Sequence, residues 1–182
     1  MALGPQLLAT LSEAGRVCVG LVFLMAATQK ASHWRILFGV ITNYRLLPRM
    51  IVVPAGALLP LLEMGVGLLL LSALALPWTL LAAALLLTLF AAAMAINLRR
   101  GRAHIDCGCG QSFLKQTLSW SLVVRNAVLA ALLLPSLAPI GPLPMSAALT
   151  GAGAGVAFFL LYLLFNTLSA LPRTSARDPH FA

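Results

Sequence analysis

The chain has 182 residues, of which 61% are hydrophobic and 9% are charged, and its mean hydropathy is +0.99. Soluble domains are about 45–50% apolar and about 25% charged, so this composition excludes a soluble globular protein. The net charge of +8 does not indicate nucleic-acid binding, because the polar segments are too short to form a basic groove. Arg and Lys beside apolar runs instead set the orientation of membrane proteins.

Apolar runs of bilayer-spanning length recur along the chain. A hydrocarbon core about 30 Å thick needs roughly 20 apolar residues in a helix. Five runs meet this requirement and predict one all-α transmembrane domain over residues 1–172, followed by a short tail at 173–182. The predicted spans cover about 7–28, 51–76, 78–98, 117–134 and 145–171.

The segment 31–50 is too polar to span the bilayer. Its apolar residues recur at helical spacing, which predicts an amphipathic helix in the headgroup region. The apolar positions are Trp34, Leu37, Phe38 and Ile41, and polar residues Arg35, Asn43 and Arg45 lie elsewhere.

Several charged residues lie inside the predicted spans. Glu13 and Arg16 are three residues apart and share a helical face, so we expect them to neutralise each other. Arg16, Glu63 and Arg125 would each cost about 2.5–3.5 kcal/mol if unpaired at a helix centre. We therefore predict that Glu63 pairs with Arg16 or Arg125, in a network that holds helices together or supports binding or proton movement.

The fifth span contains the sequence GAGAG, in which Gly151 and Gly155 have small-xxx-small spacing. This spacing lets another helix approach closely, and a flexible, glycine-rich helix start is the alternative. Cys18 lies in the apolar sequence VCVGLVF, where we expect it to be a packing residue.

The Lys and Arg residues of the connections are distributed unevenly. They follow the first, third and fifth spans, whereas the links after the second and fourth spans contain none. The positive-inside tendency therefore predicts a multi-pass protein of the cell (inner) membrane with its N-terminus outside and its C-terminus in the cytoplasm. This orientation places the polar loop 99–116 at the cytoplasmic face.

That loop contains the sequence Asp106-Cys107-Gly108-Cys109-Gly110. A disulfide between Cys107 and Cys109 would close a very small, strained ring, and Gly108 supplies the backbone freedom that it needs. Strain and exposure make a disulfide easily reduced. Nearby cationic residues could favour the thiolate, and Asp106 would oppose this effect. The alternatives are inert thiols or a metal site that also uses His104, which lacks an obvious fourth ligand.

Several segments together resemble the DoxX-like membrane family, and more narrowly its methylamine utilisation (MauE) branch. The resemblance covers about Gly15 to Leu134, most of the chain. It depends on Arg16, GLVFLMAATQK ending at Lys30, NYRLLP at 43–48, LLPLLEMGVGLLLL around Glu63, LRRGRAHIDCGCG, and Arg125-Asn126. The family usually has CGCFG at the cysteine pair, whereas this chain has CGCGQ, so one apolar contact is missing.

The resemblance implies a DoxX-like four-helix bundle with an additional fifth helix, and a redox role. Members are thought to act with a thioredoxin-like partner in maturing an exported enzyme such as methylamine dehydrogenase. Cys107 and Cys109 would then be the catalytic pair of a thiol–disulfide oxidoreductase, with Gly108, Asp106, Arg16, Glu63 and Arg125 in support. An exported partner would favour the outer face for the loop, in conflict with the charge count.

In the predicted mechanism, one thiolate attacks a partner disulfide, a mixed disulfide forms, and the second cysteine resolves it. The electrons then pass to a second carrier, for which a quinone is a candidate, although the sequence singles out no quinone pocket. The alternative function is a non-catalytic transporter or assembly subunit in which Glu63 and the arginines line a path or hold helices together.

Overall fold

The computed structural model describes residues 3–74, 76–107, 117–137 and 144–170. The helices in this part of the chain are α1 (Leu3–Ser32), α2 (Trp34–Tyr44), α3 (Arg49–Ser72), α4 (Leu76–Arg99), α5 (Trp120–Ala131), the 3-10 turn η1 (Leu134–Leu137) and α6 (Met145–Ala170). Five helical segments are long and apolar enough to cross a membrane, with α5 and η1 together forming one of them. The predicted all-α, multi-pass architecture is therefore confirmed.

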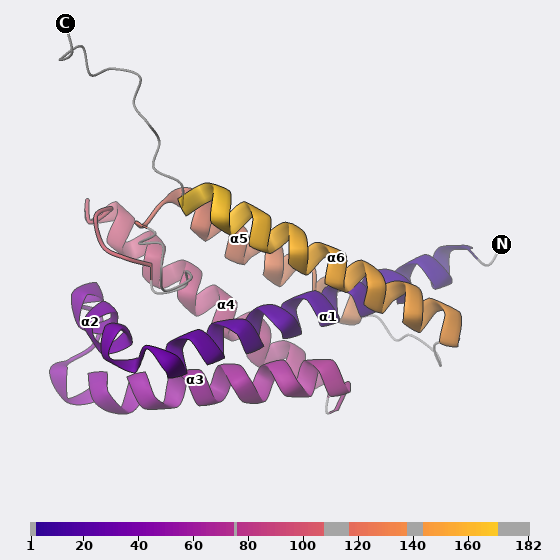
Figure 1. Ribbon diagram of the computed structural model, residues 1–182, viewed down its shortest axis with the longest axis horizontal. Helices are drawn as coiled ribbons and strands as arrows, with labels where there is room; N and C mark the ends of the chain where they lie inside the picture. Colours follow the sequence, from indigo (N-terminus) through magenta and orange to yellow (C-terminus); the bar gives the residue numbers. More distant parts are fainter. Residues whose placement is uncertain (1–2, 75, 108–116, 138–143, 171–182) are drawn as a thin grey trace, which may run out of the picture.

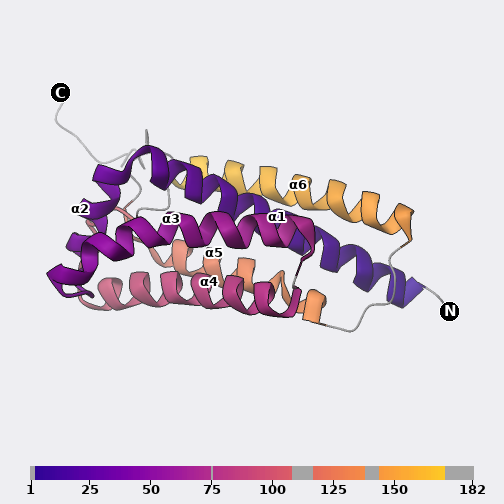
Figure 2. The same ribbon diagram turned by 90° about the horizontal axis from the view of Figure 1, so that it is seen from below.

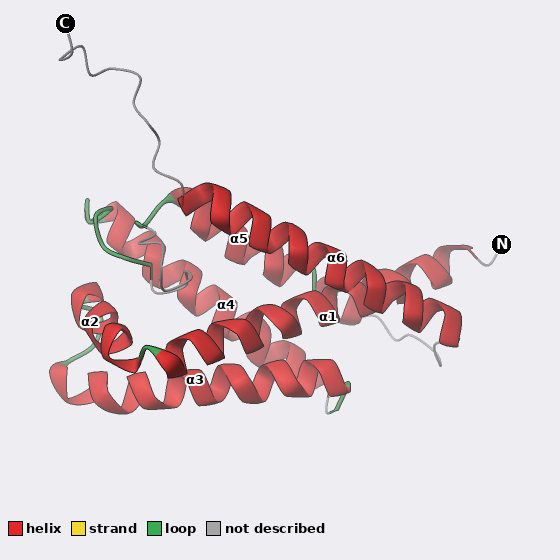
Figure 3. Cartoon of the chain, in the orientation of Figure 1, coloured by secondary structure: helices red, strands yellow, loops and turns green. Residues whose placement is uncertain are grey.

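Helix α1 occupies the middle of the bundle. It packs along α3 and along α6, while α4 packs against α5 (Figures 1 and 2). Successive spanning helices alternate in direction, so α2, the start of α3, the end of α4 and the end of α6 lie at one end of the molecule (Figure 3). The turn between α3 and α4, η1 and the start of α6 lie at the opposite end.

Exposed arginines gather at the end of the bundle that carries α2. We call this the charged end, and its arginines are Arg35, Arg45, Arg49, Arg99 and Arg100. The described residues of the links 73–77 and 135–144 lie at the opposite end, and the sequence of neither link contains Lys or Arg. The fold therefore places the connections that contain Lys or Arg at one end of the bundle and those without them at the other.

The helix boundaries differ from the predicted spans in three places. Helix α1 continues to Ser32, beyond the predicted end near 28. Helix α3 ends at Ser72 rather than near 76, because Ala73 adopts a left-handed conformation (φ 57°, ψ 20°). The α-helical part of the fourth span starts only at Trp120, because Thr117 pairs with Asp106 in an isolated antiparallel bridge.

The helices of the bundle approach closely where glycines face a neighbouring backbone. A Cβ on Gly151 would lie 2.6 Å from Cβ of Glu13, and one on Gly155 would lie 2.7 Å from Cβ of Val17, both on α1. A Cβ on Gly67 of α3 would lie 3.0 Å from the Gly20 carbonyl oxygen of α1, which is also a close approach. Because lipid supplies no hydrophobic drive between helices, such close packing holds membrane bundles together. The predicted close approach at Gly151 and Gly155 is confirmed.

Helix α2 turns its apolar side toward the bundle. Leu37 and Val40 are buried, and the Phe38 ring lies against Gly56 of α3, where an added Cβ would be 2.5 Å from the ring. Trp34 remains 56% exposed. Much of the expected apolar stripe therefore packs on protein, while Trp34 remains available for the membrane interface.

Candidate functional site

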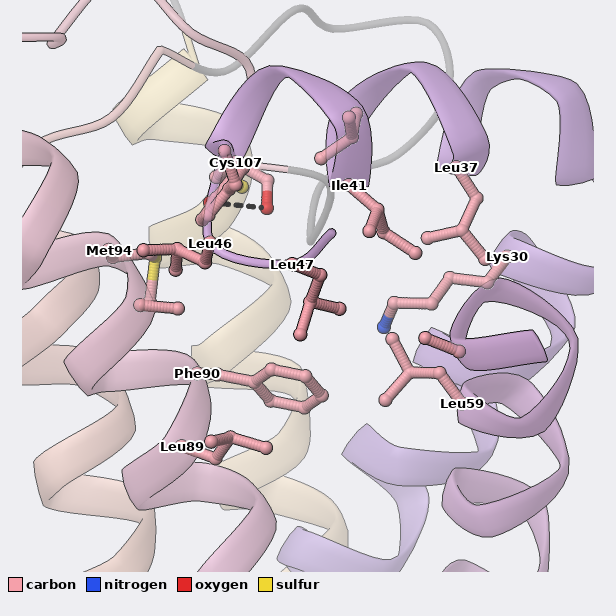
Figure 4. Close-up of a pocket in the computed structure, with 14 residues that line it drawn as sticks. Lys30, Leu37, Ile41, Leu46, Leu47, Leu59, Leu89, Phe90, Met94 and Cys107 are labelled. Atoms are coloured by element: carbon pink, nitrogen blue, oxygen red, sulfur yellow. Dashed lines mark hydrogen bonds between the residues drawn. The ribbon is translucent and has the colours of Figure 1, made fainter. Parts of the chain in front are cut away.

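Cys107 is held in place at the charged end. Its side chain is buried in an apolar cluster with Met94, Ile105, Leu118 and Leu122. The phenolic Oη of Tyr44 donates a hydrogen bond to the Cys107 carbonyl oxygen over 3.1 Å, shown by the dashed line in Figure 4. The end of α2 thus fixes the backbone of the first cysteine against α4 and α5.

The segment that carries the second cysteine is tied at both of its ends. Asp106 pairs with Thr117 in the antiparallel bridge, and the Leu118 N–H donates to the Ile105 carbonyl oxygen over 3.0 Å. The predicted site residues Gly108 and Cys109 lie outside the described residues. Asp106 is half-buried and lies directly before Cys107.

Glu63 pairs with Lys30, and the prediction that it pairs with Arg16 or Arg125 is wrong. The Lys30 Nζ donates to Oε1 and Oε2 of Glu63 over 2.6 and 2.8 Å. Both side chains are buried, and the ammonium also lies 5.3 Å from the centroid of the Phe90 ring. Because α1 continues to Ser32, Lys30 belongs to the last turn of a spanning helix and not to a surface connection.

Arg16 forms the predicted pair with Glu13 and also caps α3. Its Nη2 lies 2.5 Å from Glu13 Oε1, and its Nη1 donates to the carbonyl oxygens of Leu70 and, over 3.1 Å, Leu71. Those carbonyls belong to the last turn of α3, where the intrahelical donors run out, and the Leu70 oxygen also accepts the N–H of the C-cap residue Ala73 over 3.3 Å. A cation there also complements the negative end of the helix dipole.

Arg125 joins α5 to α6. It donates to Oδ1 of Asn166 and lies over the Tyr162 ring, 5.4 Å from its centroid. The neighbouring Asn126 bonds within its own helix, to the Leu122 carbonyl oxygen over 2.9 Å. Arg16 and Glu63 therefore act at two different positions along the contact between α1 and α3, whereas Arg125 acts at the contact between α5 and α6.

A cavity of about 260 Å³ lies between α2, α3 and α4, next to Cys107. Figure 4 shows Lys30 entering it from α1 with its ammonium toward the interior, and Phe90 and Met94 facing it from α4. Tyr44 and Cys107 also line the cavity. The cavity thus connects the buried ion pair to the first cysteine.

Two residues of this region were not predicted from the sequence. The charge count treats Lys30 as a topological charge that follows the predicted first span, and no sequence pattern gives Tyr44 a role. A signal for Lys30 was present, because it lies 14 residues after Arg16, close to a whole number of helical turns. No comparable signal marked Tyr44, whose contact with Cys107 depends on the tertiary fold.

The remaining sequence predictions concern Cys18 and metal binding. Cys18 is 1% exposed within the main apolar core, which confirms it as a packing residue. Among the described residues, no group of three His, Cys, Asp or Glu side chains could hold a metal ion. The alternative metal site includes Cys109 and so lies partly outside these residues.

Comparison with known proteins gives a consistent family match. A family model described as methylamine utilisation protein MauE matches residues 8–139. The MauE protein of Paracoccus denitrificans is 42% identical over 160 residues, covering 86% of each chain. The Methylorubrum extorquens protein is 41% identical over 146 residues, covering 78% of each. The Methylophilus methylotrophus protein is 33% identical over 164 residues, covering 86% of this chain and 84% of the relative.

No solved structure gives a significant match to the chain. The family is therefore shown by sequence similarity alone, and the arrangement of the helices is known from the present structure alone.

Proposed function

Given that the chain belongs to the MauE family of methylamine utilisation proteins, we propose that it is a membrane thiol–disulfide oxidoreductase. In this proposal Cys107 and Cys109 are the exchanging pair, and they serve the maturation of a partner enzyme or a thioredoxin-like carrier. The observation that carries the proposal is the fixed position of Cys107 beside a cavity at one end of the bundle.

The exchange uses the pair in two states. When a disulfide is to be formed in the partner, a partner thiolate attacks the Cys107–Cys109 disulfide and a mixed disulfide forms. A second partner thiolate then releases the pair as two thiols, so the partner is oxidised and the pair is reduced. The reverse reaction reduces a partner disulfide. A CxC pair suits this cycle because its small ring is easily opened.

The surroundings of the pair support a positioned rather than a freely moving thiol. Tyr44 holds the Cys107 backbone, and the residue before Cys107, Asp106, pairs with Thr117 in an antiparallel bridge. The exposed Arg99 and Arg100 lie at the same end of the bundle. Exchange requires the thiolate, which is the reactive form of a cysteine.

We also propose the orientation given by the charges, with the N-terminus outside and the charged end in the cytoplasm. Lys30 no longer contributes to the count because it is buried with Glu63, yet the exposed arginines within the described residues still lie at one end. In this orientation the pair exchanges with a cytoplasmic carrier or passes reducing equivalents through the membrane. An exported partner would require the opposite side.

Serine variants test the exchange function. Cys107→Ser with Cys109→Ser should abolish growth on methylamine as the only nitrogen source, while Cys18→Ser should leave it unchanged because Cys18 only packs. Cys109→Ser alone removes the second thiol without altering the buried Cys107. It should accumulate a reducible mixed disulfide, detected as a mass-shifted band on non-reducing gels. Immunoblots of the membranes check that each variant is present at the native level.

The outcomes also separate this function from the non-catalytic alternative. Normal growth with both cysteines replaced would refute the exchange function. If Glu63→Gln then abolished growth at a native protein level, the transporter or assembly function would be favoured. The thiol state in working membranes gives a second measurement, because a cycling pair should be found partly oxidised after alkylation of the free thiols.

A further inference from the structure

We propose that the cavity beside Cys107 binds the ring of a lipid-soluble quinone, which reoxidises the cysteine pair. This inference rests on the proposed exchange function, because a pair that oxidises a partner is left as two thiols and needs an electron acceptor. The acceptor must take two electrons and two protons, and it must be available within the membrane.

The lining of the cavity suits an uncharged ring with few polar atoms. Ligand sites of this kind are mainly apolar, with a small number of polar groups that fix orientation. Here leucines, alanines and the Phe90 ring form most of the wall, and Lys30, Tyr44 and Cys107 supply the polar atoms. A volume of about 260 Å³ is sufficient for a single substituted ring and too small for a folded peptide.

Lys30 provides the donor that a quinone carbonyl needs. An ammonium has three N–H groups, and two hydrogen bonds go to the oxygens of Glu63. The side chain is 8% exposed, and its Nζ faces the cavity (Figure 4). The third N–H can therefore donate to a carbonyl oxygen there.

The pairing of Lys30 with Glu63 favours a neutral ligand over a charged one such as a fatty acid. Glu63 neutralises Lys30 at hydrogen-bond distance, so the pair has no net charge. A carboxylate entering the cavity would be attracted by the ammonium but repelled by the adjacent Glu63. A quinone carbonyl accepts a hydrogen bond without adding a charge to the buried site, which would be costly.

The cavity also has an opening among lipid-facing side chains. Leu47 and Leu89 line it and are 43% and 57% exposed. Leu89 lies on the membrane-spanning helix α4, so its exposed surface faces the bilayer. A molecule dissolved in the lipid can therefore reach the cavity from the side.

The redox step is balanced for one quinone. The S–H bonds of Cys107 and Cys109 break and one S–S bond forms, which releases two electrons and two protons. The two quinone oxygens take up these electrons and protons, giving the hydroquinone. The proposed site consists of Lys30, Tyr44, Phe90 and Cys107, and Cys109 enters only as the second thiol of the pair.

Duroquinone is a suitable probe because its ring has no unsubstituted position for thiol addition. The full chain, purified without native quinone, is titrated with duroquinone by calorimetry. Ala93→Phe puts a ring into the cavity from α4 and should weaken binding at least about tenfold. Its matched control, Ala92→Phe, places the same ring on the exposed side of α4 and should bind like the native protein. Lys30→Met should also weaken binding, by about tenfold for the lost donor.

Single-turnover reduction of duroquinone by the pre-reduced protein then tests the redox step, and exchange with dithiothreitol tests the pair separately. Ala93→Phe should lose quinone reduction and keep the exchange reaction. If Ala93→Phe binds and reduces duroquinone like the native protein, the cavity is not the site, although the exchange function stands. If the native protein neither exchanges thiols nor reduces the quinone, the proposed function fails. A tightly bound fatty acid or phospholipid, with no duroquinone binding, would refute the quinone site alone.

Discussion

The carboxylate of Glu63 is buried and receives two hydrogen bonds from a single ammonium group, that of Lys30. Arg16 acts at the C-terminal end of α3, where it donates to the carbonyl oxygens of Leu70 and Leu71 in the last turn. Both cations stabilise contacts between α1 and α3, but only the Lys30 pair borders the cavity. Replacing only one member of that ion pair should therefore change the free energy of unfolding by a different amount from replacing both.

Glu63→Gln leaves the Lys30 charge inside the membrane without its counter-ion. We expect it to lower the free energy of unfolding by about 2.5–3.5 kcal/mol, measured by thermal or denaturant unfolding in detergent. The double variant Lys30→Met with Glu63→Leu should be less destabilised, because a buried ion pair can be replaced by apolar groups of similar volume. Equal losses in the single and the double variant would show that the charge itself is not the cause.

At the scale of helices, the sequence allowed the five spans to be predicted because length and hydropathy depend only on local composition. The pairing of Glu63 could not be predicted in this way, because it depends on which helices are neighbours. Helix α3 packs on α1, whereas α5, which carries Arg125, packs on α4. Arg16 and Lys30 are separated by about 21 Å along α1 at 1.5 Å per residue, and Lys30 is the one near Glu63.

The cysteine pair, like the spans and the Glu63 ion pair, has one feature that is visible in the local sequence and others that depend on how the helices pack. Its spacing predicts thiol chemistry from the sequence alone, since only Gly108 separates Cys107 from Cys109 in the chain. The hydrogen bond from Tyr44 and the cavity beside Cys107 depend on α2 folding back over α3 and α4, for which no local pattern exists. The pair can therefore be predicted from the sequence as a candidate site, whereas the surroundings of Cys107 cannot.

The contact between α1 and α6 makes a prediction for two glycines of the same GAGAG sequence. Gly155→Ala would place a Cβ 2.8 Å from the Ala14 carbonyl oxygen, part of a helix backbone that cannot turn aside. A Cβ on Gly153 meets nothing within 4 Å. We expect Gly155→Ala to lower the free energy of unfolding by about 1–3 kcal/mol through overpacking, and Gly153→Ala to leave it unchanged or slightly higher. Unfolding curves in one detergent compare the two, and equal stability would refute the close contact.

For the whole molecule, the important asymmetry is that exposed arginines and Cys107 share one end of the bundle. Any sidedness found for the charged end therefore also applies to the start of the cysteine segment, since Cys107 is anchored there by Tyr44. The positive-inside tendency and an exported partner favour opposite sides for this end. A topology measurement consequently limits which partners can exchange with the pair.

Reporter cysteines at the two ends decide the orientation. In a chain whose native cysteines are replaced by serine, Ala73→Cys marks the turn after α3 and Ala103→Cys marks the charged end, and both positions are exposed. With the proposed orientation, a membrane-impermeant maleimide added to intact cells should label Ala73→Cys strongly and Ala103→Cys only after the cells are opened. The reverse pattern would overturn the proposed orientation. It would place Cys107 at the outer face, where direct exchange with an exported enzyme needs no carrier across the membrane.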